Sequence, residues 1–214
     1  MVFLFLCTEL KFQLLSFAFM NYLGHAYLSF GDSEIITGNL IGDHVKGKLA
    51  LNNFPENISK GIILHRKIDS FTDVHTATKE AAQYFKKEYG LYAGSIMDVL
   101  FDHFLANDKR FFASELVLLE FSLQIFSKID LHAAHLPETF ARYFPYMKSQ
   151  NWLYNYRTND GILQSLNGLS KRAKYIAPIG KAHQIFMENY DVLNKYYFYL
   201  IDDLIKFTKN ELIV

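Results

Sequence analysis

The chain has 214 residues, half of them apolar, and its 22 basic and 22 acidic side chains balance. This length supports one domain with a sizeable core and is short for two. The balanced charge gives no overall field that attracts nucleic acid or an anionic membrane, so we expect neither partner. The single cysteine, Cys7, excludes an internal disulfide and a Cys-x-x-Cys zinc motif, and is typical of a cytoplasmic protein.

Residues 1–19 are apolar, but Glu9 and Lys11 interrupt them. They lack the basic start and the small-residue cleavage site of a signal peptide, and the apolar run is too short for a membrane span. Met20 begins a more regular segment. We therefore expect residues 1–19 to be an N-terminal extension from an upstream start codon, with a genuine amphipathic extension as the alternative. Residues 20–214 are expected to form the domain.

From residue 20 onward, apolar side chains recur at spacings of three and four, which predicts helices. Pro55 suits a first helical turn, and Ser95-x-x-Asp98 resembles a capping box that opens a helix at residue 95. No run of alternating strand residues is present, so we expect an all-α, single-domain helical bundle. After a short apolar stretch over 21–30, the predicted helices cover 34–45, 55–70, 73–89, a segment from 95, 113–129, 138–148, parts of 151–170, and 179–210.

His65 and Asp69 lie four residues apart in one predicted helix, so both side chains project from the same face. An imidazole and a carboxylate that converge in this way suit a divalent cation or a general acid–base pair. The alternative is an exposed pair that stabilises the helix by a few tenths of a kcal/mol. The apolar neighbours of the pair and the separate charged face at Arg66 and Lys67 weigh against that alternative.

Other acids and one histidine lie in apolar surroundings. Asp102 stands among large apolar residues, where a lone charge is too costly, so it must reach water, a cation or a metal. Asp43 follows a glycine at a helix end and either ligates or caps. His103 is a candidate for the same site or a buried core histidine. Asp73 and Asp98 are interpreted as helix caps.

Two further pairs are weaker candidates. His132 and His135 form a His-x-x-His in a predicted loop and are expected at the surface. Arg157 and Arg172 are candidate phosphate ligands, because a guanidinium binds two phosphate oxygens at once, although surface positions are the commoner outcome. No Walker loop, GxGxxG or GxSxG motif occurs, so nucleotide-loop and serine-hydrolase chemistry have no support.

Several of these residues belong to segments that resemble the bacterial acyl carrier protein phosphodiesterases, also called holo-acyl carrier protein hydrolases. The similar segments occur in the family's order from Met20 to about residue 205, whereas residues 1–19 have no recognisable counterpart. The stretch around HRKIDSFTD is the most specific of them. In chain order they are MNYLGHAYLS, GNLIGDHVKG, GIILHRKIDSFTD, DVLFDHFL, NWLYNYR and LNGLSKR.

The resemblance implies a helical fold distantly related to the HD phosphohydrolases, with Mn²⁺ or another divalent cation as cofactor. Carried over by position, the implied metal ligands or their immediate neighbours are His25, Asp43, His65, Asp69 and Asp102. The implied catalytic residues are Asp69, His103 and Arg66. In this scheme Arg66, with Arg157 or Arg172, neutralises phosphoryl charge, and His103 or His25 protonates the leaving group.

The resemblance also implies the reaction, which is hydrolysis of the phosphodiester that joins 4′-phosphopantetheine to a serine of holo-acyl carrier protein. The expected partner is typically acidic, so we expect docking on the basic residues Lys46, Lys48, Arg66 and Lys67. Two alternatives remain open from the residues. One is an HD-like phosphohydrolase that acts on a nucleotide or another small phosphodiester, and the other is a non-catalytic module that binds acyl carrier protein.

Overall fold

The computed structural model describes residues 22–172 and 178–212, and within these ranges the regular elements are all helices. The all-α, single-domain prediction is therefore confirmed, while the relationship to HD phosphohydrolases stays a prediction. The first half of the described chain contains α1 (Tyr22–Tyr27), α2 (Ser33–Ile41), η1 (Gly42–His44), η2 (Leu49–Asn53), α3 (Glu56–Val74), α4 (Thr76–Tyr89), η3 (Gly90–Tyr92) and α5 (Ala93–Asn107), where η marks a 3-10 helix.

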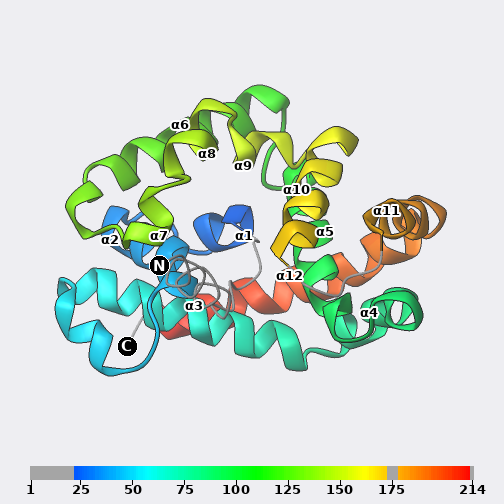
Figure 1. The fold of residues 1–214 in the computed structure, drawn as a ribbon, viewed down its shortest axis with the longest axis horizontal. Coiled ribbons are helices and arrows are strands. Elements are labelled where there is room, and N and C mark those ends of the chain that lie inside the picture. The colour runs from blue at the N-terminus through cyan, green and yellow to red at the C-terminus, as the bar shows by residue number, and fades with distance from the viewer. Residues whose placement is uncertain (1–21, 173–177, 213–214) are drawn as a thin grey trace, which may run out of the picture.

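The second half begins with an arch of helices and ends with the longest helix of the described chain (Figure 1). The helix expected over 138–148 is interrupted near Arg142, and that expected over 179–210 is broken at Asn189. The elements are α6 (Glu115–Asp130), η4 (Ala133–His135), α7 (Glu138–Ala141), α8 (Phe144–Ser149), α9 (Trp152–Asn155), α10 (Asn159–Arg172), α11 (Ile179–Glu188) and α12 (Tyr190–Leu212).

The helix that precedes Asp43 is shorter than expected. Asp32 caps α2, because its Oδ1 accepts hydrogen bonds from the backbone N–H groups of Glu34 and Ile35. The α-helix then ends at Ile41 rather than continuing to 45, and the chain tightens into the 3-10 turn η1. This turn is what carries Asp43 around the end of α2 toward α3.

The helix that carries His65 and Asp69 is longer than expected and ends at Val74. Asp73 therefore lies inside α3, and its expected role as the cap of the next helix is wrong. The cap of α4 is His75, whose Nδ1 accepts a hydrogen bond from the backbone N–H of Ala77. A neutral imidazole can supply the acceptor that an aspartate usually provides at this position.

The capping box expected at Ser95 is also absent. A 3-10 turn over Gly90–Tyr92 leads directly into α5, which begins at Ala93, so Ser95 and Asp98 lie inside the helix. Ser95 is buried. Asp98 therefore follows the face of α5 that also carries Asp102 four residues later.

Two glycines allow α2 and α3 to cross with their backbones in contact. A Cβ atom on Gly38 would lie 2.0 Å from the carbonyl oxygen of Ile58, and one on Gly61 would lie 2.4 Å from that of Ile35. Only glycine tolerates such an approach. The crossing brings Asn39 of α2 beside the start of the α3 segment that carries His65.

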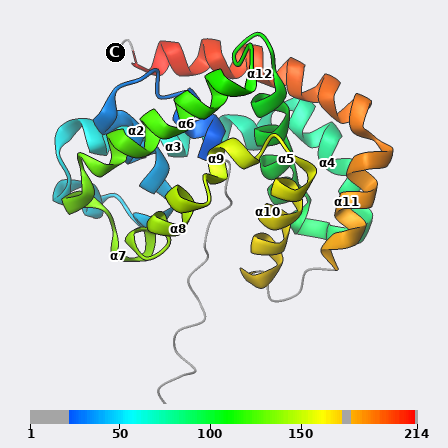
Figure 2. The same cartoon turned by 90° about the horizontal axis from the view of Figure 1, so that it is seen from above.

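The helices enclose α1, which lies near the middle of the molecule in two perpendicular views (Figures 1 and 2). Helix α2 packs along α3, while α1 contacts both α2 and α5. The arch over α6 to α9 lies on one side of α1, and α3 with α12 lies on the other. None of the helices in the described ranges combines the length and the apolar character needed to cross a membrane.

Candidate metal centre

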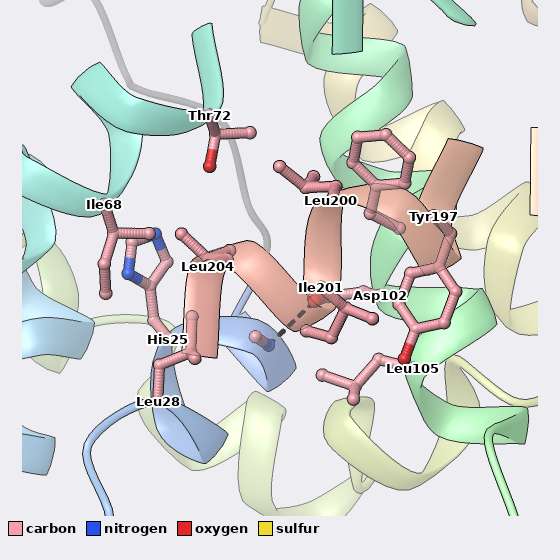
Figure 3. Close-up of a pocket in the computed structure, with 12 residues that line it drawn as sticks. His25, Leu28, Ile68, Thr72, Asp102, Leu105, Tyr197, Leu200, Ile201 and Leu204 are labelled. Carbon is pink, nitrogen blue, oxygen red and sulfur yellow. Dashed lines mark hydrogen bonds between the residues drawn. The ribbon is translucent and has the colours of Figure 1, made fainter. Parts of the chain in front are cut away.

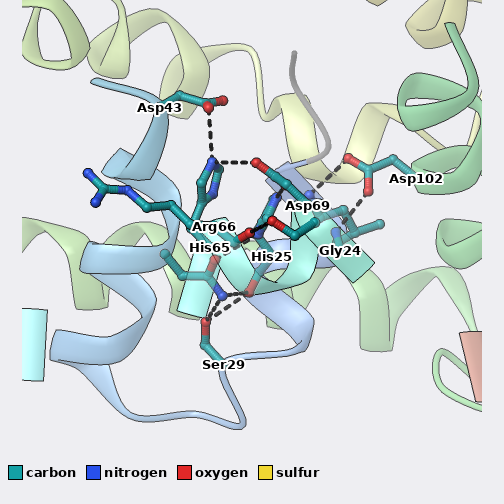
Figure 4. A network of polar contacts seen from close by, with 11 residues as sticks. Gly24, His25, Ser29, Asp43, His65, Arg66, Asp69 and Asp102 are labelled. Atoms are coloured by element: carbon teal, nitrogen blue, oxygen red, sulfur yellow. Dashed lines mark hydrogen bonds and ion pairs between the residues drawn. The ribbon is translucent and has the colours of Figure 1, made fainter. Parts of the chain in front are cut away.

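Three side chains from two helices meet at the centre of the molecule (Figure 4). His65 and Asp69 project from one face of α3, with 3.2 Å between His65 Nε2 and Asp69 Oδ2. His25 comes from α1, and its Nε2 lies 3.2 Å from the other oxygen, Asp69 Oδ1. The two imidazole rings stack with their centroids 4.1 Å apart. One potential ligand atom from each residue lies within 4.8 Å of the others, which is compatible with a single divalent cation.

A buried amide fixes the orientation of His25. The side-chain nitrogen of Asn39 donates to the backbone carbonyl of His25 at 3.0 Å and to the hydroxyl of Ser29 at 3.0 Å. Because a carbonyl only accepts, the amide oxygen must face His25 Nδ1, 2.7 Å away. Nδ1 therefore carries the hydrogen, and Nε2 of the neutral ring presents its lone pair to the cluster.

Asp43 contacts the same nitrogen of His65 as Asp69 does. Its Oδ1 lies 2.9 Å from His65 Nε2, and it reaches that position from the 3-10 turn after α2. Gly42 makes room for the imidazole, since a Cβ atom there would lie 2.3 Å from His65 Cγ. The glycine before Asp43 is thus explained by the ring that packs against it.

The pKa values of His65 and Asp69 are both shifted within the cluster. Burial lowers the pKa of His65, but hydrogen bonds and charge interactions with Asp43 and Asp69 outweigh it and raise the pKa to about 10. Burial raises the pKa of Asp69, yet its interactions with His25 and His65 hold that pKa well below its usual value. Asp69 is also half-exposed, with a side-chain accessibility of 40%, so it is the member of the triad that faces solvent.

Several acidic side chains lie close to one another around the triad. Burial raises the pKa of Asp98 well above its usual value, and the charges of Asp69, Asp73, Asp102 and Asp43 raise it further. The expected capping role of Asp98 is wrong for the reason given above, and its place is instead on the face of α5 toward α3. The raised pKa of Asp98 thus reports repulsion among these carboxylates, which a bound cation would relieve.

Asp102 lies beside the triad, where it anchors α1. Its two oxygens accept the backbone N–H groups of Leu23 and Gly24 at 3.0 and 2.8 Å. Burial raises its pKa to about 8, while the hydrogen bonds from Gly24, Leu23 and the Tyr156 side chain act in the opposite direction. Asp102 thus fixes the first turn of the helix that carries His25, and direct ligation by Asp102 stays a prediction.

His103 faces away from the triad, because consecutive helix positions point about 100° apart. Its Nδ1 lies 2.8 Å from the carbonyl oxygen of Tyr156, and its Nε2 lies 3.1 Å from the hydroxyl of Tyr190. The ring also packs edge-on against Phe186, and burial lowers its pKa. The structure thus describes the buried core histidine that was one of the two alternatives, and a catalytic role stays a prediction.

Of the three arginines predicted to bind phosphate, Arg66 and Arg157 have other partners in the structure. Arg66 follows His65, but its Nη2 donates to the carbonyl oxygens of Val45 and Gly47 at 2.7 and 3.2 Å. Arg66 thereby anchors the loop after Asp43. Arg157 stacks on Tyr154 and forms an ion pair with Glu115 at 3.1 Å. The side chain of Arg172 lies outside the described part of the chain, so phosphate binding by any of the three stays a prediction.

The remaining histidine pair does not join the site. His132 Nε2 lies 3.0 Å from the hydroxyl of Ser33 on α2, and His135 lies in the 3-10 turn η4.

Sequence reasoning missed Asn39, although a signal was present. An amide surrounded by apolar residues in a predicted helix must find hydrogen-bond partners when it is buried, and here the partners are His25 and Ser29.

The triad passes a physical test for a cation site. His25 Nε2 is buried and has no hydrogen-bond partner in the described structure, although Asp69 Oδ1 lies 3.2 Å away. Buried polar atoms are nearly always satisfied, so the lone pair of this nitrogen is available to a ligand. Two imidazoles and one carboxylate are donors that divalent transition metals accept, and an outer amide that orients one imidazole is typical of such sites.

Comparison with known proteins identifies the family of the chain. The sequence profile of the family described as acyl carrier protein phosphodiesterase matches residues 20–204. The chain belongs to the acyl carrier protein phosphodiesterase family. This confirms the family resemblance found in the sequence. No solved structure matches the chain.

Curated members of the acyl carrier protein phosphodiesterase family align over most of the chain, and each of those described here carries the family's name. A relative from Enterobacter sp. (strain 638) is 30% identical over 192 residues, which are 90% of this chain and 99% of that protein. One from Yersinia pestis is 31% identical over 174 residues, or 81% and 90% of the two chains. One from Escherichia coli O6:H1 is 30% identical over the same shares.

Proposed function

We propose that this protein releases 4′-phosphopantetheine from holo-acyl carrier protein, using a divalent cation held by His25, His65 and Asp69. The family supports the reaction class, since the relatives are named acyl carrier protein phosphodiesterases. The observation that carries the cation is the meeting of three donor atoms within 4.8 Å, two of them on buried imidazoles. Mn²⁺ is the cation that we expect. We place the activity in the cytoplasm, in keeping with the single cysteine.

The reaction breaks one bond of the phosphodiester. Water adds to phosphorus, the bond between phosphorus and the serine oxygen of the carrier breaks, and that oxygen takes up a proton. When bound, the cation supplies a Lewis acid that polarises a phosphoryl oxygen and lowers the pKa of water. The half-exposed edge of Asp69 marks the side on which the substrate approaches.

The protein's own contribution is to fix the donors before substrate arrives. Asn39 sets the tautomer of His25, Asp43 holds His65, and Asp102 holds the first turn of α1. Each of these hydrogen bonds joins two different elements, so the triad does not need to reorganise during the reaction.

A groove on the solvent side of α3 supports docking of an acidic carrier. It has a volume of about 640 Å³, and the basic residues of its lining are Lys48, Arg66 and Lys67, of which Lys67 pairs with Glu211. The lining also includes the apolar side chains of Leu51 and Phe71. A groove with apolar and basic walls is complementary to a helix that carries acidic and apolar side chains.

The proposed function is tested by mixing the purified protein, Mn²⁺ and holo-acyl carrier protein, and following the intact mass of the carrier. We expect the carrier to lose its phosphopantetheine arm, and we expect no loss when the cation is removed with a chelator. Asp69→Asn should reduce the rate by at least about 100-fold, since it removes the only carboxylate of the triad, while circular dichroism stays helical. An intact carrier with the wild-type protein and Mn²⁺ would contradict the proposal.

A further inference from the structure

A small apolar pocket lies directly behind the triad, between α1, α3, α5 and α12 (Figure 3). Its walls include Leu28, Ile68, Leu105 and Leu204. His25 forms part of the wall, and the same ring carries a donor atom of the triad. The pocket has a volume of about 40 Å³. Since about 10–15 Å³ of such space holds one water, the pocket accepts a group of about three non-hydrogen atoms.

One hydroxyl that lines this apolar pocket forms no hydrogen bond with the described residues. Thr72 is 5% exposed, and its Oγ1 has no hydrogen-bond partner in the described structure. A buried threonine in a helix commonly donates to the carbonyl four residues earlier, as Thr37 and Thr208 do at 2.8 Å. Thr72 does not, and Figure 3 shows its oxygen directed into the pocket instead.

Two other polar side chains of the wall, apart from His25 of the triad, are already engaged. The hydroxyl of Tyr197 donates to Asp108 at 3.0 Å, and both oxygens of Asp102 accept backbone N–H groups. A buried hydroxyl without a partner is costly, so the site calls for a ligand that combines an apolar branch with one hydroxyl. The lining of the pocket therefore fits a ligand that has both of these groups.

We propose that this pocket binds the pantoyl part of the phosphopantetheine arm. The inference rests on the proposed function. The carbon that bears two methyl groups is three covalent bonds from phosphorus, and the next carbon carries a hydroxyl. With the phosphate at the triad, the dimethyl carbon enters the apolar pocket past His25, and the neighbouring hydroxyl shares a hydrogen bond with Thr72 Oγ1. The amides and the thiol of the arm lie further from phosphorus and extend outward.

The pocket gives the site a means of choosing its substrate. A phosphodiester without a branched carbon at this position leaves the pocket unfilled and Thr72 unpaired. A nucleotide has a ring there instead, and a ring exceeds the available space. The pantoyl group is thus selected by shape and by one hydrogen bond, close to the bond that breaks.

The experiment measures dissociation constants by calorimetry in the presence of Mn²⁺, for 4′-phosphopantetheine and for an analogue in which both methyl groups are hydrogens. With the wild-type protein we expect the analogue to bind about 10- to 20-fold more weakly, from the loss of two buried methyl groups. Leu204→Phe fills the pocket and should bring this ratio close to one. Leu123→Phe, on the exposed face of α6, is the control and should keep the wild-type ratio.

A second variant addresses the hydroxyl and does not depend on tolerance of a larger side chain. Thr72→Val has nearly the same shape as the wild type, and we expect it to keep the methyl ratio. It should lose the roughly 10-fold preference of the wild type for 4′-phosphopantetheine over the analogue without the pantoyl hydroxyl. Thr76→Val, at the exposed start of α4, is the matched control.

The outcomes separate this inference from the proposed function. If the wild-type protein removes the arm from the holo-carrier but binds both ligands equally, the pocket is not the pantoyl site and the proposed function stands. A methyl ratio unchanged in a folded Leu204→Phe protein, or a hydroxyl preference unchanged in Thr72→Val, also overturns the inference. If the wild-type protein does not release the arm at all, the proposed function fails and this inference fails with it.

Discussion

The orientation of single side chains decides what the triad can bind. His25 presents Nε2 to the cluster only because the amide oxygen of Asn39 faces its Nδ1. Asp69 has one oxygen toward each histidine, at 3.2 Å in both cases. A donor set oriented in this way binds a cation at a low cost in side-chain entropy, because its rotamers are already fixed.

Asn39 therefore makes a testable contribution that does not involve contact with the cation. Asn39→Ala removes the partner of His25 Nδ1 and lets the ring turn or change tautomer. We expect the affinity for Mn²⁺ to fall about 10- to 100-fold, as measured by titration of the purified protein. Asn167→Ala, at an exposed position of α10, is the control. An unchanged affinity in a folded Asn39→Ala protein would show that Asn39 does not orient the ligand.

The pair of His65 and Asp69 was predictable from the sequence, whereas the partner of His25 was not. A spacing of four residues places two side chains on one helix face, whatever the rest of the fold does. That Asn39 lies beside His25, fourteen residues away, depends on how α1 packs on α2, and no local pattern carries that information. The same holds for Asp102, whose contact with Gly24 spans 78 residues.

A second buried carboxylate makes a pH-dependent contribution to stability away from the site. Asp108 is nearly inaccessible, accepts hydrogen bonds from Arg110 and Tyr197, and joins the end of α5 to α12. Burial raises its pKa, but these partners lower it below the usual value. Because the folded pKa lies below the unfolded value of about 3.9, the contribution is complete above about pH 5 and is lost as the pH falls through the folded pKa.

We expect Asp108→Asn to lower the free energy of unfolding by about 1.5–3 kcal/mol at pH 7, since it removes the acceptor of charged hydrogen bonds. The difference from wild type should shrink as the pH falls below about 4, where the wild-type carboxylate is also protonated. Urea unfolding followed by circular dichroism at pH 7 and pH 3 measures both values. A difference that stays constant with pH would show that packing rather than charge explains the loss.

At the scale of elements, the α2–α3 crossing sets the position of the site. Gly38 and Gly61 let the two backbones touch, which places Asn39 and the turn with Asp43 against α3. Glycines in the predicted helix over 34–45, Gly38 and Gly42, permit a close approach of another backbone. The break at Ile41 was not predictable, since it follows from η1 packing Asp43 and Gly42 around His65.

Gly38→Ala tests this crossing. The added Cβ would lie 2.0 Å from the carbonyl oxygen of Ile58, so the helices must separate, and we expect a loss of about 1–3 kcal/mol or more in urea unfolding. Gly94→Ala is the matched control, because nothing lies within 4 Å of a Cβ atom there and it is also in a helix. We expect Gly94→Ala to be neutral or to stabilise by up to about 1 kcal/mol. Equal effects of the two changes would contradict close contact at the crossing.

At the scale of the whole molecule, the net charge is zero, but basic residues still gather on one local surface. Lys46 and Lys48 lie in the exposed loop between η1 and η2, close to the groove along α3. Arg66 and Lys67 of the same surface are partly engaged, Arg66 with loop carbonyls and Lys67 with Glu211. The two loop lysines have no ion pair with the described residues, so they are the cations most available to an acidic partner.

Reversing these two charges separates docking from chemistry. We expect Lys46→Glu with Lys48→Glu to raise the KM for holo-acyl carrier protein about 10-fold at low salt, with little change in kcat, because the charges act on encounter with the carrier. The dependence of KM on salt should weaken as well, since fewer charges remain to be screened. Lys86→Glu with Lys87→Glu, on the exposed end of α4 at the opposite side of the molecule in Figure 1, is the matched control. An unchanged KM in the loop variant, or an equal rise in the control, would place the docking surface elsewhere.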